Sequence, residues 1–362
     1  MARKSLLSSH NTAGWIFAGP ILLLFSVFMI LPFVMGFLLS MTNARLISPN
    51  PPEFVGFSNY QRMFDVAILT IDPIRDEAGQ IIYDEGGQPT YPRTRNWTRN
   101  KEEYPQFFRK TEVFRFNALR GEKRKNVFLA REPSFVHAMK NTLFFVAVVA
   151  PLQSFLALGL ALLINQKLPG INIFRAIYFM PVVISMIVVA FLFRLVYDAE
   201  SGLLNNLLGG MTFGLIEPID WLGQRSTALW AIIIMSIWQG VGFHMVIWLA
   251  GLQTIPATLY EAAKMEGANG WQRIRFVTWP GLRNTAILIM IIITMQAFTL
   301  FVQVAVMTDG GPLNSTTSLV YEIVRRGAVQ QQLGFGSAMA IVMFLIVLSI
   351  SLIQQWISRQ RS

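Results

Sequence analysis

Long apolar runs separated by polar segments are the dominant pattern along this chain of 362 residues. Six runs have the length of about 20 residues that a helix needs to cross about 30 Å of hydrocarbon. The first run is too long for a cleavable signal peptide, and no small-residue cleavage site follows it. The pattern therefore predicts an all-α membrane protein with six transmembrane helices, at Trp15–Leu39, Thr142–Ile164, Ala176–Val196, Leu229–Leu249, Ala286–Met307 and Ser337–Ile357.

Charged residues are few and are concentrated in one segment. They make up 14% of the chain, whereas a soluble domain carries about 25%. Of the 50 charged residues, 27 lie within Met41–Ser134. The rest of the chain has too few charges to cover a water-facing surface of its size, which excludes a soluble enzyme.

The charged segment predicts a mixed or β-containing extracytoplasmic insert between the first two transmembrane helices. Gln80–Tyr91 has the pattern of two short strands around a glycine-containing turn, and Val113–Phe116 with Val127–Ala130 has that of a second hairpin. Both a solvated spacer and a docking surface for an external partner are compatible with this pattern. We predict three parts: residues 1–40 (tail and first helix), 41–134 (insert) and 135–362 (five-helix core with a cytoplasmic loop at 252–283).

The distribution of Lys and Arg predicts the orientation, because short cytoplasmic loops are enriched in both. With the N-terminus inside, the cytoplasmic segments hold ten basic residues and the two short external loops hold Arg225, Arg325 and Arg326. We therefore expect both termini to be cytoplasmic, in a plasma or inner membrane.

Several kinds of chemistry are excluded by what the sequence lacks. It has no cysteine, and its three histidines, His10, His137 and His244, are scattered, so we expect no metal site. It has no phosphate-binding loop for ATP and no hydrolase motif, and no basic face for nucleic acid. His244 is the only candidate for a proton relay inside the spans, and we expect it to be a buried histidine with its hydrogen bonds satisfied.

The loop between the fourth and fifth spans carries the most specific pattern. Pro256 stands at a first-turn position, and Leu259, Ala262, Ala263 and Glu266 then follow at helical spacing, up to Gly267. A second short helix is expected at Trp271–Thr278. The small residues favour docking of a partner over a helix lying on lipid headgroups, which would need a basic face and larger apolar residues.

This loop resembles the EAA motif of binding-protein-dependent ABC importer permeases. The motif reads E-A-A, three residues, G, nine residues, I, one residue, L-P, and here Glu261, Ala262, Ala263, Gly267 and Pro280 stand at its positions, with Val277 for Ile and Trp279 for Leu. Flanking segments are similar to the carbohydrate branch, the maltose-type permeases. The long insert is a departure from the family pattern.

The resemblance implies that these five loop residues form a coupling helix seated on a cytoplasmic ATPase. It also implies two ATPase subunits that hold ATP and Mg, a second homologous permease and an extracytoplasmic solute-binding protein, in a bacterial or archaeal membrane. No cofactor and no catalytic residue are then expected on this chain, which is a transport subunit and not an enzyme.

Two sets of polar positions are candidates for the solute pathway. Ser236, Gln239, Gly240 and Phe243 share one helical face, as do Gln296, Thr299, Leu300 and Gln303. Uncharged hydrogen-bonding groups beside aromatic rings suit a sugar, although polar groups that join membrane helices would give the same pattern. In maltose-type permeases the equivalent region lines the sugar site, and Leu300 is the one of these eight residues that we do not assign to the pathway.

The sequence thus predicts the permease subunit of an importer for a sugar or sugar-like solute. Two alternatives remain open at this point. One is a stand-alone polytopic protein, either a secondary carrier or a scaffold. The other is a permease of the same family for a different solute, such as glycerol phosphate.

Overall fold

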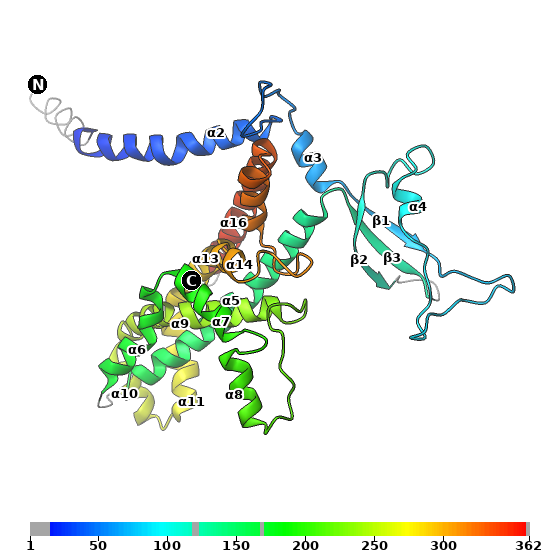
Figure 1. The fold of residues 1–362 in the computed structure, drawn as a ribbon. Helices are drawn as coiled ribbons and strands as arrows, with labels where there is room; N and C mark the ends of the chain where they lie inside the picture. Colours follow the sequence, from blue (N-terminus) through cyan, green and yellow to red (C-terminus); the bar gives the residue numbers. More distant parts are fainter. Residues whose placement is uncertain (1–14, 118–122, 167–169, 360–362) are drawn as a thin grey trace, which may run out of the picture. The chain divides into compact units, whose positions relative to one another are not determined.

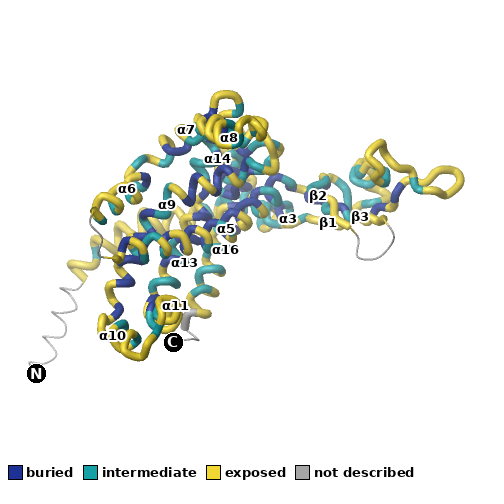
Figure 2. The backbone as a smooth tube through the Cα atoms, turned by 90° about the horizontal axis from the view of Figure 1, so that it is seen from below, coloured by how far each residue is buried: buried dark blue, intermediate teal, exposed yellow. Residues whose placement is uncertain are grey.

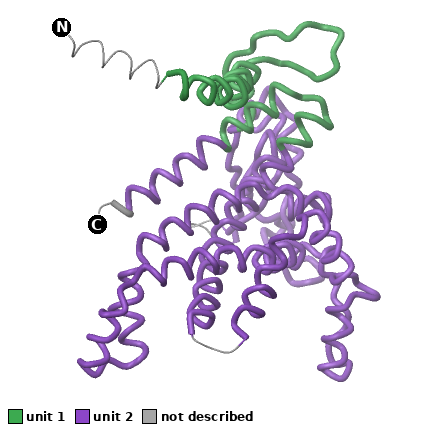
Figure 3. Tube along the Cα trace, turned by 90° about the vertical axis from the view of Figure 1, so that its left-hand side faces the viewer, with its two compact units in different colours: residues 1–63, 323–343 green, residues 64–322, 344–362 purple. Residues whose placement is uncertain are grey.

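The structure is a computed structural model that describes residues 15–117, 123–166 and 170–359. The chain divides into two compact units, coloured separately in Figure 3. Unit 1 comprises residues 1–63 and 323–343, and unit 2 comprises residues 64–322 and 344–362. The division into residues 1–40, 41–134 and 135–362 stays a prediction. Arg3, Lys4, Lys167, Arg361, His10 and residues 120–122, between the two predicted strands of the second hairpin, lie outside the described residues.

Unit 1 contains the first apolar helix, Trp15–Ser40, as the sequence predicts. A π-helical turn at Ser26–Ile30 leads into α2, Leu31–Ser40, which has Pro32 in its first turn. Because proline has no N–H and its ring crowds the carbonyl one turn earlier, a wide turn before it is a common accommodation. None of the most apolar stretch of this helix is buried, as expected for a surface that faces lipid. The unit also contains most of α3 (Ser58–Phe64), the π-turn η3 (Arg325–Val329) and the start of α16 (Leu333–Arg359).

The insert contains a three-stranded antiparallel sheet in the order β1-β3-β2, visible in Figure 1. Strands β2 (Thr111–Asn117) and β3 (Lys125–Ala130) confirm the predicted second hairpin. Strand β1 (Val66–Ile71), which the sequence analysis did not predict, pairs with the other edge of β3. Leu69, Ile71, Val127 and Leu129 form the core on one face, and α4 (Arg95–Thr98) brings Trp97 against it.

The predicted first hairpin, Gln80–Tyr91, does not form as two strands. Pairing there is limited to the isolated bridges Arg75↔Ile81 and Tyr83↔Pro89. The Asp76 and Asp84 carboxylates each accept a backbone N–H from four residues on, both at 2.8 Å. These side chains close two tight turns in succession, which leaves too few residues between them for a regular ladder.

The remaining helices of unit 2 comprise the membrane core and the segments that connect its helices (Figure 1). Their bounds are α5 Pro133–Ile164, α6 Ile171–Val183, α7 Met186–Val196, α8 Leu203–Met211, α9 Ala228–Gln253, α10 Ala257–Met265, α11 Gly270–Arg273, η2 Ile274–Thr278, α12 Trp279–Gly281, α13 Arg283–Phe298, α14 Val302–Met307 and α15 Leu319–Val324, the last of which runs into unit 1.

Helix α9 is the centre of this core. It packs most extensively on α5 and also contacts α6, α7, α13 and α14. Of its most apolar stretch 61% is buried, against none for the first span, and Figure 2 shows dark blue along α9 where α10 and α11 are yellow. A helix that is apolar on all sides is expected at such a central position.

The third predicted span, Ala176–Val196, is interrupted. Helices α6 and α7 meet at an angle of 98°, with Ile184 and Ser185 extended between them. Pro181 lies inside α6, one turn before the break. A proline weakens the turn that precedes it, whereas the interruption follows Val183, so Pro181 does not by itself explain the break.

The fifth predicted span, Ala286–Met307, is wrong as a single helix. Helix α13 ends at Phe298, and α14 begins at Val302. The Thr299 hydroxyl donates to the Gln296 carbonyl at 2.7 Å, and the Ser318 hydroxyl donates to the carbonyl of Leu300. These hydroxyls satisfy carbonyls that a continuing helix would use, so the backbone can turn without leaving them unpaired.

Among the described residues, four helices are long and apolar enough to cross a membrane, and there are up to six if each bent pair counts as one span. The second bent pair, Gly270–Gly281 with Arg283–Phe298, turns through 69°. The mainly helical architecture with a small sheet in the insert confirms the predicted fold class.

Candidate functional sites

The helix predicted for the loop that carries the E-A-A sequence is present as α10. Pro256 lies just before it, at the N-cap, and not within its first turn. Helix α10 has no buried residue: Glu261 and Ala262 are exposed and Ala263 is half-buried. The E-A-A sequence is therefore displayed on the surface, where a partner could contact it.

The end of α10 is fixed by a glycine in the left-handed conformation. Gly267 has φ = 74°, its N–H donates to Lys264 O at 3.1 Å, and the N–H of Ala268 donates to Ala263 O at 2.9 Å. This pair of bonds is the Schellman motif, which satisfies the last carbonyls of a helix. A Cβ on Gly267 would meet nothing within 4 Å, so the residue is required here for its backbone angle alone.

The return from α10 to the membrane core is held by local bonds. Asn269 and Gln272 form a reciprocal capping box at the start of α11. The Tyr260 hydroxyl lies 3.0 Å from that of Thr278 in η2, and Pro280 stands in the first turn of α12. The exposed segment from α10 to α12, which we call the coupling segment (residues 257–281), thus has a defined conformation.

The second site is a pocket inside the membrane core of unit 2. Its volume is about 350 Å³, at the lower end of the range typical of small-molecule sites. All seven residues that the sequence assigns to the solute pathway line it: Ser236, Gln239, Gly240, Phe243, Gln296, Thr299 and Gln303. The structure therefore brings together two sets that lie more than fifty residues apart in the chain.

The interruption between α13 and α14 shapes one wall of this pocket. Gln296 lies near the end of α13, Thr299 in the break and Gln303 in α14, and all three line the pocket. Leu300 does not line it; this residue is 1% exposed. The three polar residues reach one pocket from a broken helix and not, as predicted, from the face of a continuous one.

Helix α9 approaches its neighbours closely where it carries glycine. A Cβ on Gly242 would lie 1.9 Å from the carbonyl oxygen of Tyr178 in α6, and a Cβ on Gly240 would lie 2.2 Å from Gln153 Nε2 in α5. The absence of side chains at these positions lets α6 and the Gln153 amide lie directly against α9. Gln153 is buried and lines the pocket.

Sequence reasoning missed two of the pocket's polar residues, Gln153 and His244. The expectation that His244 is fully hydrogen-bonded is wrong: its Nδ1 lies 3.0 Å from Gln153 Nε2 and 2.9 Å from the Gly240 carbonyl, whereas its Nε2 has no partner among the described residues. Gln153 is the only long polar side chain in the apolar stretch Phe144–Ile164 of α5, and this isolation was the available signal.

The lining of the pocket is polar but carries no formal charge. Of the described residues that line it, none is Asp, Glu, Lys or Arg. The hydrogen-bonding groups are four glutamines, two hydroxyls and one imidazole, beside the rings of Phe145 and Phe243. Such a lining can exchange hydrogen bonds with hydroxyl groups, while its rings can cover apolar C–H surface.

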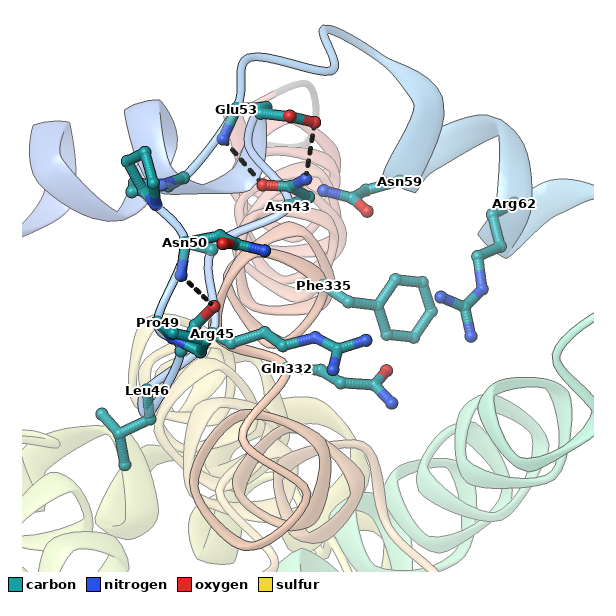
Figure 4. Close-up of a pocket in the computed structure, with 14 residues that line it drawn as sticks. Asn43, Arg45, Leu46, Pro49, Asn50, Glu53, Asn59, Arg62, Gln332 and Phe335 are labelled. Carbon is teal, nitrogen blue, oxygen red and sulfur yellow. Dashed lines mark hydrogen bonds between the residues drawn. The ribbon is translucent and has the colours of Figure 1, made fainter.

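A larger pocket of about 880 Å³ lies within unit 1 and is drawn in Figure 4. Asn43 and Glu53 are joined across it by two hydrogen bonds, of 3.2 and 2.8 Å, and the Arg62 guanidinium lies 4.6 Å from the centre of the Phe335 ring. Arg45 adds a second cation. Because most of its lining comes from an irregular loop, no periodic pattern in the sequence indicated this pocket.

Comparison with known proteins agrees with the motif on α10. Residues 153–362, more than half of the chain, match the family described as the binding-protein-dependent transport system inner membrane component. The chain belongs to this family. It is accordingly an inner-membrane component of an ABC transport system, and the matched residues include both the coupling segment and most of the pocket.

Individual relatives carry the same kind of description. The trehalose/maltose transport system permease protein MalF of Thermococcus litoralis is 34% identical over 238 residues, which is 65% of this chain and 78% of the relative. The probable starch degradation products transport system permease protein AmyD of Thermoanaerobacterium thermosulfurigenes is 25% identical and covers 100% of this chain and 99% of its own length. Both are permease proteins of transport systems.

A solved structure has the same fold over almost the whole length. It belongs to a bacterial ABC transporter involved in the import of the acidic polysaccharide alginate, and its chain aligns with a TM-score of 0.67 over 98% of both chains. The sequences are 19% identical. The likeness establishes the fold, including the insert, and not the solute.

Proposed function

We propose that this chain is the membrane-spanning permease subunit of an ATP-driven importer for an uncharged sugar or sugar-like polyol. One observation carries the proposal: the uncharged, hydrogen-bonding pocket in the membrane core, which the seven pathway residues line. A sugar has a hydroxyl on most of its carbons and apolar C–H faces, so it needs both kinds of contact that the lining offers. The sugar-transporting relatives named above support the same class of solute.

The lack of charge favours this solute over glycerol phosphate. A phosphate ester leaving water needs cationic or multiple N–H partners, because burying an uncompensated charge is costly. None of the described lining residues carries a positive side chain. A neutral polyol has no such requirement.

The coupling segment supplies the second half of the proposed mechanism. Glu261, Ala262 and Ala263 dock on one of two cytoplasmic ATPase subunits, while Gly267 and Pro280 set the direction of the helix. ATP and Mg are bound by the ATPases, and closure of the ATPase pair moves the core helices through α10. A second, homologous permease and an extracytoplasmic solute-binding protein complete the transporter.

We further propose that both termini are cytoplasmic, which places the insert and its sheet outside the cell membrane. This orientation agrees with the excess of Lys and Arg in the short loops on the coupling-segment side of the membrane. It also puts the insert on the side from which a solute-binding protein approaches. A secondary carrier is disfavoured because no Asp or Glu lines the pocket among the described residues.

The test is co-purification followed by uptake. The chain is co-expressed with the neighbouring ATPase and permease genes, captured in detergent, and compared with Glu261→Arg. Glu200→Arg makes the same charge change at an exposed position outside the coupling segment and serves as the control. We expect the ATPase to co-purify with wild type and the control and to be lost with Glu261→Arg.

Reconstituted wild-type complex is then supplied with its binding protein, ATP and a panel of radiolabelled mono- and disaccharides that includes maltose and trehalose. We expect ATP-dependent uptake of at least one saccharide. Uptake of none of the saccharides, or an ATPase that never co-purifies with wild type, would contradict the proposal.

A further inference from the structure

Among the described residues, His244 has hydrogen-bond partners at only one of its two ring nitrogens. The residue is 1% exposed and lies in α9. Its Nδ1 has Gln153 Nε2 at 3.0 Å and the Gly240 carbonyl oxygen at 2.9 Å, yet its buried Nε2 has no partner among the described residues. A buried polar atom without a partner is uncommon in native proteins and calls for an explanation.

The two contacts at Nδ1 leave Nε2 polar in either tautomer. If Nδ1 accepts from the Gln153 amide, the ring proton is on Nε2, which is then a donor. If Nδ1 donates to the Gly240 carbonyl, Nε2 is an acceptor. A solute hydroxyl can both donate and accept, so it can pair with Nε2 in both cases, whereas an apolar neighbour cannot.

We infer that His244 contacts the transported solute through Nε2 and that Gln153 is the positioning residue that holds the imidazole for this contact. The inference rests on the proposed function, since it assigns a role within the same pocket. His244 and Gln153 both line that pocket, from α9 and α5. Nε2 is closed to water here, so the inference requires that the widening of the pocket during import expose this atom to the solute.

A second unpartnered atom supports this role. Ser236 Oγ is buried, lines the same pocket and also has no partner among the described residues. Ser236 and His244 are eight residues apart on one helix, which is about 12 Å along the axis at about 1.5 Å per residue. Two hydrogen-bonding residues with this spacing along one helix suit a solute longer than a single sugar ring, such as a disaccharide.

Gly240 completes the arrangement. A Cβ at this position would lie 2.2 Å from Gln153 Nε2, so any larger residue would move the amide away from the imidazole. The same residue provides the carbonyl that lies beside Nδ1. Gly240 therefore acts on the orientation of His244 in two ways, although it has no side chain.

The test uses two variants of the complete reconstituted transporter to distinguish the role of His244 Nδ1 from that of Nε2. The Asn side chain can place its amide near the position of Nδ1, so His244→Asn keeps the contacts with Gln153 and Gly240 and removes Nε2. Gln reaches farther, so His244→Gln keeps a polar group near Nε2 and gives up the contacts at Nδ1. Import is measured with the saccharide that wild type takes up, at saturating concentration, where the binding protein is fully loaded in every sample.

We expect His244→Asn to assemble like wild type but to import about 3- to 10-fold more slowly, the factor that one neutral hydrogen bond supplies. His244→Gln should retain most of the import. Gln153→Met keeps the side-chain volume and removes the amide. This variant should assemble, and its import rate should lie between those of His244→Asn and His244→Gln. Normal import by His244→Asn together with loss of import by His244→Gln would overturn the inference, because only a structural role through Nδ1 gives that result.

Deoxy analogues of the imported saccharide provide a readout that a structural role would not move. The analogue that lacks the contacted hydroxyl should be imported equally slowly by wild type and by His244→Asn, so that the two losses are not additive. Additive losses for every analogue would overturn the inference while leaving the proposed function intact. If wild type imports no saccharide at all, the proposed function fails and the inference is withdrawn with it.

Discussion

The coupling segment and the pocket in the membrane core both depend on glycine, but for different physical reasons. At Gly267 the surroundings are open, and the residue is needed because φ is 74°. At Gly242 the backbone is ordinary helix, and the residue is needed because a carbonyl oxygen of α6 occupies the place of a Cβ. In the coupling segment glycine is needed for its left-handed backbone conformation, and in the membrane core it is needed because there is no room for a side chain.

The same contrast holds for the polar groups of the two regions. The coupling segment satisfies its polar groups with neighbours in sequence, as in the capping box of Asn269 and Gln272. The pocket pairs residues that are far apart, such as Gln153 with His244, and leaves Ser236 Oγ and His244 Nε2 without a partner in the part of the chain that the structure describes. Under the proposed function this difference is expected, because a docking surface can have all its polar groups paired before the partner binds, whereas a transport site needs free hydrogen-bonding groups for its solute.

The largest effect is expected from Gly242→Ala. The added Cβ would lie 1.9 Å from the Tyr178 carbonyl oxygen, and backbone cannot move aside as a flexible side chain can. We expect a loss of about 1–3 kcal/mol or more in the free energy of unfolding, seen as a lower melting temperature and poor yield in detergent. Gly159→Ala in α5, where a Cβ meets nothing within 4 Å, is the control and should be tolerated. If Gly242→Ala and Gly159→Ala had the same melting temperature and yield, the close approach of the Tyr178 carbonyl oxygen would not be the reason for glycine at position 242.

Gly267→Val should be the next most severe change, and its defect should be confined to the coupling segment. The left-handed conformation costs an L-residue about 1–2 kcal/mol, and β-branching adds to that strain. We expect the transporter to insert but to lose co-purifying ATPase. Gly267→Asn is the matched control, because asparagine tolerates this conformation. If asparagine and valine lost the ATPase to the same extent, the backbone angle would not be the cause.

Gly240→Ala should have a smaller and more selective effect than Gly242→Ala. The obstacle here is the end of the flexible Gln153 side chain, 2.2 Å from the added Cβ, so the helices can stay in place while the amide moves. We expect normal assembly and ATPase activity with reduced saccharide import, measured in proteoliposomes. A folding defect as large as that of Gly242→Ala would contradict this distinction, because it would show that Gly240 too is needed for the close packing of helices.

The smallest effect is expected from Tyr260→Phe. It removes the hydroxyl that lies 3.0 Å from Thr278 Oγ1 and leaves the ring in place, at a cost of about 0.5–1.5 kcal/mol. We expect the ATPase to dissociate somewhat faster from the variant in a surface-immobilised complex, with import reduced less than twofold. Thr278→Val should behave in the same way, and the double variant should show non-additive losses.

Much of the coupling segment could be predicted because its determinants are local. The positions of α10, of the turn at Gly267 and of the second short helix follow from residues within one or two turns of each other. The pairing of β2 with β3 was accessible for the same reason, since a short connection joins the two strands. Strand β1 could not be predicted in this way, because its partner β3 is more than fifty residues away in the chain.

The pocket could be predicted only in part. Helical periodicity brought Ser236, Gln239, Gly240 and Phe243 to one face, and the face of α9 does line the pocket. Periodicity could not identify Gln153, because a lone polar residue has no pattern, and it gave the wrong geometry around Thr299, where side-chain hydroxyls end the helix. One of these hydroxyls belongs to Ser318, which lies 18 residues along the chain from the Leu300 carbonyl that accepts its hydrogen bond.

The sequence by itself therefore determined the membrane class, the number of apolar runs, the motif of the coupling segment and the residue types available to a solute. These depend on composition and on spacing along a few helical turns. Only the tertiary structure decided where the helices break, which polar residues share a pocket and which nitrogen of His244 has no partner among the described residues. These depend on contacts between helices that lie far apart in the chain, where one missing Cβ or one distant hydroxyl decides how closely two backbones approach.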